Sequence, residues 1–309
     1  MRKAAILLAA LSGTLLAGEA TAPASLVREG VTERLTRHVY AIPDGSAMLV
    51  PNVGIIVGRN AVLVVDTGMG TRNAETVLRE VAKVGLDEHR KPKPIYIVTT
   101  HVHPEHDMGA HAFPKNSKLL RSRDQLADIA AGTGTSLVPM FASRSRLNAE
   151  LLKDARHRDA DIVYDKEYTL DLGGVTAKIR AMGLNHTLGD TVVLVDGVLF
   201  AGDIAMKPQP MVLSPKVTLT HWLASLDALE AMHPRRIVPS HGPFGGLELV
   251  EGYRAYLTHI RARTAELRKA GKTQDETVQI VTDEMAAQYP DKFRLRGAIR
   301  AGWLEAADR

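Results

Sequence analysis

A short histidine-rich segment constrains this chain more than any other feature of its sequence. Residues 101–107 read His-Val-His-Pro-Glu-His-Asp, directly after an apolar run at residues 94–100. The run predicts a buried strand. Three imidazoles and two carboxylates in such a short stretch are hard to explain as packing. The segment therefore predicts a metal site, and the alternative is a solvated loop that happens to be rich in histidine.

The spacing within the segment favours ligands that converge. Alternation along an extended chain points His101 and His103 the same way, and a turn at Pro104 brings Glu105 and His106 round. The chain contains no cysteine. Thiolate ligands, thiol nucleophiles and disulfides are therefore excluded, whereas imidazole and carboxylate remain good ligands for Zn²⁺.

Three single residues further along the chain also follow predicted strands. A lone histidine or aspartate at a strand end is usually structural, but their order after the histidine cluster makes them candidates for the same site. They are His186 after the strand at 175–182, Asp203 after the strand at 198–201, and His241 after the strand at 237–239.

The order of predicted elements indicates the fold class. Strands, a helix, a strand and helices are followed by the same order again, which predicts an α/β (α+β) fold with two sheets and helices outside, an αββα sandwich. No linker divides residues 23–309, which are expected to form one domain with a helical tail from about 247. The other predicted elements are strands at 39–42, 48–57, 61–65 and 191–195, and helices at 73–84, 121–161 and 223–232.

The first 22 residues have the composition of a signal peptide. Arg2 and Lys3 precede a short apolar run at residues 4–17, and small residues follow up to Ala22. The run is shorter than the ~18–20 residues that a membrane span needs. We expect a mature protein that is periplasmic or secreted, without stable membrane insertion after processing.

The charge of the chain bears on its partners. The net charge is +4 with a pI near 9.2. This is compatible with an anionic small-molecule substrate but far from the basic footprint of a nucleic-acid-binding protein. The sequence does not determine the oligomeric state.

The histidine segment and the later His, Asp and His together resemble the signature of the metallo-β-lactamase superfamily, H-x-H-x-D-H followed by a distant His, Asp and His. The resemblance extends from about Val39 to Gly242. It implies an αββα sandwich with the site along one edge. It also implies a first metal ion on His101, His103 and His186, a second on Glu105, His106 and His241, and a carboxylate, Asp203, that bridges both.

Two acidic residues receive catalytic roles from the resemblance. Asp203 would accept a proton from the attacking water. Asp66, in Val65-Asp66-Thr67-Gly68, matches the family's acidic turn beside the site and would orient a ligand histidine without binding metal.

One position departs from the family. Glu105 stands where the family usually has aspartate, so its carboxylate lies one methylene farther out. Ligation, weaker ligation and a role outside the ligand set all remain open for it. The implied cofactor is Zn²⁺, two ions per chain, with Fe or Mn as alternatives.

The resemblance implies an exported hydrolase that uses a dizinc-bound hydroxide on an ester, lactone or thioester-type substrate. The signal peptide, the glutamate and the helical tail are similar to those of a SoxH-like subgroup. The alternatives are β-lactamase activity, a mononuclear iron persulfide dioxygenase, and a non-catalytic accessory protein of a periplasmic redox system. The loop at residues 207–215 is expected to edge the substrate pocket, and Trp222 to be core.

Overall fold

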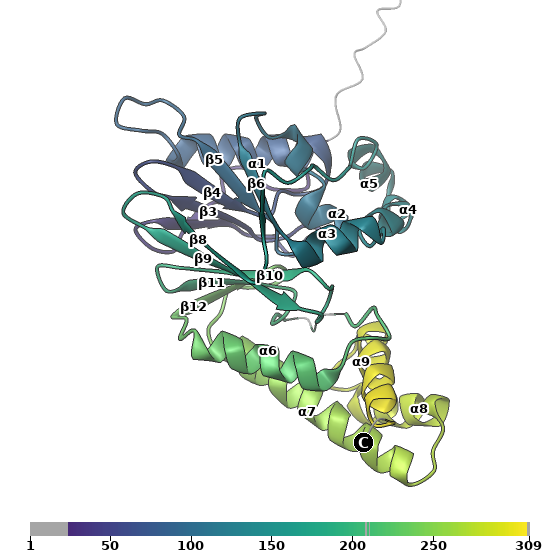
Figure 1. The fold of residues 1–309 in the computed structure, drawn as a ribbon. Coiled ribbons are helices and arrows are strands. Elements are labelled where there is room, and N and C mark those ends of the chain that lie inside the picture. The colour runs from purple at the N-terminus through teal and green to yellow at the C-terminus, as the bar shows by residue number, and fades with distance from the viewer. Residues whose placement is uncertain (1–23, 208, 210, 308–309) are drawn as a thin grey trace, which may run out of the picture.

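Two β-sheets stacked face to face form the centre of the molecule, with helices on both outer faces (Figure 1). This αββα arrangement and its mixed α/β class confirm the sequence prediction. The computed structural model describes residues 24–207, 209 and 211–307. The predicted signal peptide at residues 1–22 lies outside the described residues.

The first sheet has seven strands, hydrogen-bonded in chain order. In β4, Val62 and Val64 pack with helix α1, whereas Leu63 and Val65 pack between the two sheets. Because both faces are covered, the strand is a continuous apolar run. The strands are β1 (Glu33–Arg34), β2 (Val39–Ile42), β3 (Val53–Val57), β4 (Val62–Val65), β5 (Ile95–Val98), β6 (Lys118–Ser122) and β7 (Ile162–Tyr164).

The second sheet has five strands in the order β12-β11-β10-β9-β8. Phe200 and Val238 face the first sheet, whereas Leu199 and Ile237 face the helices below. Each sheet thus contributes one face to a core shared between them. The strands are β8 (Glu167–Asp171), β9 (Thr176–Gly183), β10 (Asp190–Val195), β11 (Val198–Gly202) and β12 (Arg236–Pro239).

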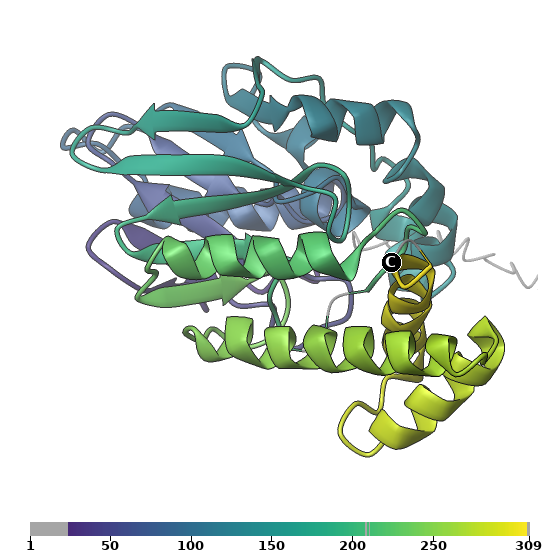
Figure 2. The ribbon, with the colours of Figure 1, turned by 60° about the horizontal axis from the view of Figure 1, so that its bottom comes forward.

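The helices form the two outer layers. Helix α1 covers the first sheet, α6 and α7 cover the second, and α8 and α9 extend this lower layer at one end (Figures 1 and 2). Trp222 of α6 is fully buried there against Tyr253 of α7, as predicted. The longer helices are α1 (Gly70–Val84), α3 (Arg123–Ala130), α6 (Leu219–Ala231), α7 (Glu248–Lys269), α8 (Gln274–Met285) and α9 (Lys292–Glu305), and the short ones are α2 (Pro104–Asp107), α4 (Val138–Ala142), α5 (Arg146–Leu151), η1 (Ala110–Ala112) and η2 (Thr135–Leu137).

No helix within the described residues has the length and apolar character needed to cross a membrane.

The prediction was wrong at the start of the middle segment. Residues 121–161 were expected to be helical, but Arg121 and Ser122 end strand β6, which pairs in parallel with β5. The guanidinium of Arg121 is buried against Asp107. A charge at a buried strand position hides the apolar pattern by which such strands are found.

Candidate metal centre

The ends of parallel strands position four of the eight candidate site residues. Strand β4 is parallel to β5 in the first sheet, and β11 is parallel to β12 in the second. The carboxyl ends of parallel strands share one edge of a sheet, where ligand sites commonly form. The residues that follow these ends are Asp66 after β4, His101 after β5, Asp203 after β11 and His241 after β12.

All seven residues expected as metal ligands come together at this edge. Three groups each offer one nitrogen or oxygen per residue, with these atoms within 4.8 Å of one another. Two of the groups are those that the resemblance implies, and the third connects them. The groups are His101, His103 and His186; Glu105, His106 and His241; and His101, His106 and Asp203.

Five imidazole rings are crowded into this space. The centroid of His101 lies 4.0 Å from that of His106 and 4.5 Å from that of His103. Burial lowers the pKa of His101 and His103 well below the ordinary imidazole value, and lowers the pKa of His186 and His241 as well. These four rings are therefore neutral near pH 7, which is the form that binds metal.

Several ligand atoms are buried without a hydrogen-bond partner in the described part of the chain. A buried polar atom left unpaired costs about 1–3 kcal/mol, so a convergent set of them calls for a bound group. Divalent cations bound among these atoms would satisfy them, and nitrogen and oxygen ligands suit zinc, iron or manganese. The atoms are Nε2 of His101 and His106, Oε2 of Glu105 and Oδ1 of Asp203.

The Nδ1 atoms of three histidines are held by acceptors outside the ligand set. His106 Nδ1 lies 2.8 Å from Asp66 Oδ2, and His186 Nδ1 lies 2.6 Å from the carbonyl oxygen of Met211. His241 Nδ1 lies 2.9 Å from the carbonyl oxygen of Val50. Such contacts fix the ring and its tautomer, so that Nε2 is free to bind metal.

Asp66 is held in an unusual backbone conformation. Its φ is +66°, in the left-handed region that residues other than glycine seldom adopt. Its carboxylate accepts hydrogen bonds from the backbone N–H and the hydroxyl of Thr100, at 2.7 and 3.0 Å. Strain of this kind concentrates at functional sites. Here it directs the carboxylate toward His106.

The charge of His106 depends on its acidic neighbours. Burial alone would lower the pKa of His106, but the carboxylates of Asp66 and Glu105 outweigh it and raise the pKa to about 9. Without a metal this ring is therefore protonated near pH 7. A cation that binds at Nε2 must displace that proton.

Glu105 reaches the second group in spite of its extra methylene. It lies in the short helix α2, where a turn at Pro104 was expected, and its side chain is buried. Oε1 lies 3.7 Å from His106 Nε2 and 4.0 Å from His241 Nε2. Burial raises the pKa of this carboxyl to about 7, so a nearby cation is needed to keep it charged.

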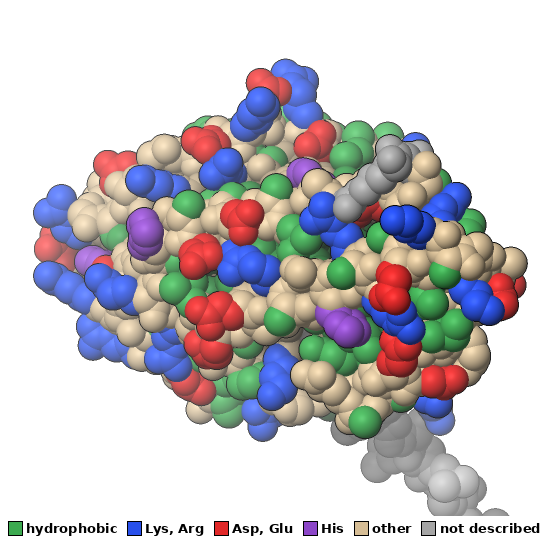
Figure 3. Space-filling view, turned by 90° about the horizontal axis from the view of Figure 1, so that it is seen from below, with side chains coloured by type: hydrophobic (Ala, Val, Ile, Leu, Met, Phe, Trp, Pro, Cys, Tyr) green, Lys and Arg blue, Asp and Glu red, His purple; other side chains and the backbone are tan. Residues whose placement is uncertain are grey.

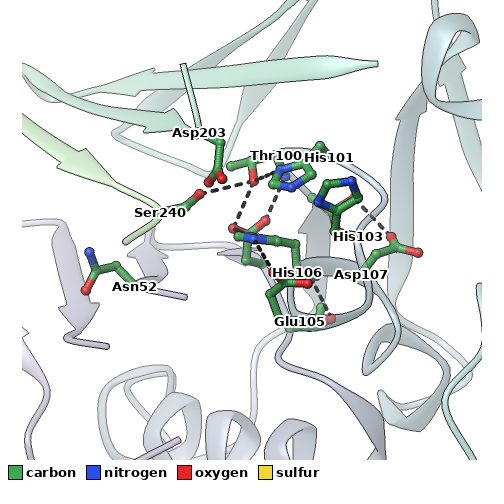
Figure 4. A network of polar contacts seen from close by, with 12 residues as sticks. Asn52, Thr100, His101, His103, Glu105, His106, Asp107, Asp203 and Ser240 are labelled. Carbon is green, nitrogen blue, oxygen red and sulfur yellow. Dashed lines mark hydrogen bonds and ion pairs between the residues drawn. The ribbon is translucent and has the colours of Figure 1, made fainter. Parts of the chain in front are cut away.

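Asp203 lies between the two groups. It descends from the second sheet toward the histidines of the first (Figure 4). Oδ2 is 3.5 Å from His186 Nε2, and Oδ1 is 3.9 Å from His241 Nε2. Burial alone would raise the pKa of Asp203, but the surrounding histidines hold it below the usual range for aspartate. The carboxylate is therefore charged and faces both sets of nitrogens.

Residues 48–241, well over half of the chain, match the sequence model of the Metallo-beta-lactamase superfamily. The chain belongs to this superfamily.

One curated member of known activity is a linear primary-alkylsulfatase from Pseudomonas sp. (strain ATCC 19151). It is 27% identical over 256 residues, which cover 71% of this chain and 47% of that protein. The chain thus spans about half the length of this relative. Family and relative together support a hydrolase.

Solved structures of the superfamily share the fold. A sec-alkylsulfatase from Pseudomonas sp. has a TM-score of 0.66 at 16% identity and covers 88% of this chain and 49% of its own. A metallo-beta-lactamase from Pontibacter korlensis has a TM-score of 0.55 at 19% identity. The match covers 72% of this chain and 96% of that structure. A beta-lactamase domain protein from Burkholderia ambifaria has a TM-score of 0.63 at 20% identity. The match covers 90% of this chain and 88% of that structure.

Sequence reasoning missed a buried ion-pair network behind the superfamily motif. Asp107, the last residue of α2, is fully buried and receives two hydrogen bonds from Arg121, at 2.6 and 3.1 Å. His157 Nδ1 lies 2.5 Å from the same carboxylate, and Thr99 donates to it at 3.0 Å. The network ties the helix that carries Glu105 and His106 to strand β6. No spacing in the sequence links these residues.

Asn52 is a second residue that the sequence did not reveal. Its side-chain amide donates to the carbonyl oxygens of Pro239 and Gly242, at 2.8 and 2.9 Å. Its own side-chain oxygen accepts the backbone N–H of Asp44 at 2.7 Å. Asn52 thereby fixes the turn that presents His241 against the first sheet.

Proposed function

We propose that this protein is a metal-dependent hydrolase of an ester-type bond in a small molecule, with two zinc ions as its cofactor. The observation that carries the proposal is the convergence of unpartnered, buried nitrogen and oxygen atoms from both sheets on one edge. An arrangement that leaves such atoms unpaired is unfavourable unless a cation binds them.

Each residue has a defined task in this proposal. His101, His103 and His186 would hold one ion, Glu105, His106 and His241 would hold the other, and Asp203 lies close to His101 and His106 between the two groups. Bound metal supplies Lewis-acid chemistry, polarising the scissile group and lowering the pKa of water. The Asp203 carboxylate, charged and buried at the centre, accepts the proton of the attacking water. Asp66 keeps His106 oriented.

The substrate class combines two lines of support. The superfamily resemblance favours a carboxylic ester, lactone or thioester, and the match to a primary-alkylsulfatase adds sulfate esters. Each of these bonds joins an oxygen or sulfur leaving group to an electrophilic carbon or sulfur whose oxygen a bound cation would polarise. The proposed location is periplasmic or secreted.

Metal analysis of the purified protein, run with a hydrolysis panel, tests the proposal. The panel contains a 4-nitrophenyl ester, a lactone, a thioester, a primary alkyl sulfate and nitrocefin. We expect zinc and turnover of at least one ester-type substrate, lost on chelation and restored by Zn²⁺. Full zinc loading without any turnover would favour the accessory-protein alternative. One iron per chain with sulfite production would favour the dioxygenase.

A further inference from the structure

A groove lies between the loop at residues 211–215 and helix α9. Its volume is about 390 Å³, within the range of about 300–1,000 Å³ typical of small-molecule sites. The helix contributes Phe293, Gly297, Arg300 and Leu304. These recur every three or four positions, so one face of α9 forms a continuous wall.

The wall and the loop expose apolar side chains to solvent. Leu213, Phe293 and Leu304 are 42%, 72% and 38% exposed. They are three of the seven large hydrophobic residues exposed in the described part of the chain, and all three line this one groove. On the lower face, formed by the helical layer, hydrophobic side chains lie open among charged ones (Figure 3). Apolar side chains that gather around a cavity are typical of a binding surface.

The loop of the groove also contacts the metal centre. The carbonyl oxygen of Met211, which lines the groove, lies 2.6 Å from His186 Nδ1. Helix α9 holds the same loop, since Arg294 donates to the carbonyl oxygen of Gln209 at 2.6 Å. At Gly297 an added Cβ would lie 2.8 Å from the carbonyl oxygen of Val212, so the close approach requires glycine.

We propose that this groove binds the apolar chain of the substrate, so that the substrate is an amphiphile with an alkyl or acyl chain. The inference rests on the proposed function, which supplies the reacting end of the molecule at the ions. From Phe293 to Leu304 the wall runs about 16 Å at a rise of 1.5 Å per residue, which suits an extended chain better than a compact group.

Binding of primary alkyl sulfonates, which have no ester bond to cleave, tests the groove without turnover. Calorimetry on the zinc-loaded protein should show Kd falling by up to about fourfold per added methylene from ethyl to decyl sulfonate. Leu213→Glu and Phe293→Glu should each raise the Kd of decyl sulfonate roughly tenfold. The Kd of ethyl sulfonate should stay within about twofold of the wild-type value. Val163 is 45% exposed on strand β7 and provides the control. Val163→Glu should change the Kd of neither decyl sulfonate nor ethyl sulfonate.

The outcomes separate the groove from the activity. Affinity independent of chain length, or a chain-length dependence that both groove variants retain, would overturn the inference even in an active hydrolase. Chain-dependent binding that the groove variants abolish, in a protein that cleaves no ester, would support the groove and refute the proposed function. All variants are exposed at the changed position, so unfolding midpoints close to wild type are expected and are measured alongside.

Discussion

Nδ1 of His106 lies 2.8 Å from Oδ2 of Asp66, and both side chains are buried. The contact presents Nε2 of the same ring to Glu105 and His241. A carboxylate at this position fixes the orientation of a ligand histidine and raises its basicity. Asp66 is itself held by two hydrogen bonds from Thr100, so little freedom remains in the pair.

Asp66→Asn should therefore weaken metal binding at the second group. Loss of the negative charge lowers the basicity of His106, and changes of this kind cost about 10–100-fold in metal affinity or activity. Zinc titration against a chelating dye, with kcat/KM on the best substrate, measures both. Asp165→Asn is the matched control, because its carboxylate is exposed and pairs only with Arg123. Equal zinc affinity in the two variants would exclude an orienting role for Asp66.

Removal of first-group ligands should remove metal and activity together. His101→Ala and His186→Ala each delete one of three nitrogens that hold an ion, so native mass spectrometry should show at least one zinc fewer than in wild type. Turnover should fall to background. His89→Ala, at a largely exposed histidine, should keep wild-type values for both. Wild-type turnover in either ligand variant would mean that the chemistry occurs elsewhere.

Glu105→Gln should lower the occupancy of one of the two ions. A neutral amide is a poorer ligand for a hard cation, while His106 and His241 remain in place. Glu105→Asp restores the residue usual in the family and should keep more metal than the glutamine variant. The measurement is zinc stoichiometry at increasing chelator concentration. Two equivalents bound as tightly in Glu105→Gln as in wild type would show that Glu105 is not a ligand.

Arg121→Met should destabilise the fold strongly. It leaves the Asp107 carboxylate buried without its cation, and breaking a buried ion pair costs about 3–5 kcal/mol. Arg123→Met, two positions along, breaks an exposed pair with Asp165 and should cost no more than about 1 kcal/mol. Chemical denaturation of both variants gives the comparison. Similar free energies of unfolding would argue that the Asp107 network adds nothing.

Acid should unfold the protein partly through Asp107. Burial would raise the pKa of this carboxyl, but Arg121 outweighs it and lowers the pKa from 3.8 to about 2. A lowered pKa contributes stability that is present above the unfolded value of 3.8 and is lost as pH falls through about 2. In metal-free protein, the unfolding free energy of wild type should fall between about pH 4 and pH 2 more steeply than that of Asp107→Asn. Parallel curves would contradict this.

The candidate metal site could be proposed from the sequence because its residues come shortly after predicted strands. His101 and His241 are examples, and the order of such residues along the chain matches a known signature. The partners of the ring nitrogens were beyond prediction. Their partners are the backbone carbonyl oxygens of Met211 and Val50. Every residue has a backbone carbonyl, so the residue type does not identify which ones contact a ligand ring.

Charged residues in the interior caused two further errors. Arg121 is buried in β6 and paired with Asp107. An arginine is usually exposed, so the residue type predicted the opposite. His157 has no ligand spacing in the sequence, yet its ring contacts the same carboxylate. The tertiary structure shows that both side chains contact the Asp107 carboxylate, which compensates for the cost of burying them.

The contact between His241 and the carbonyl of Val50 joins parts of the chain 191 residues apart. The contact depends on the docking of the two sheets, and contacts so distant in sequence carry a loop-closure cost. A divalent metal ion that binds only the docked form would then act as a reversible cross-link between the halves and would stabilise that form by mass action. When the metal is scarce, the folded protein would accordingly be lost to proteolysis, in addition to losing its activity.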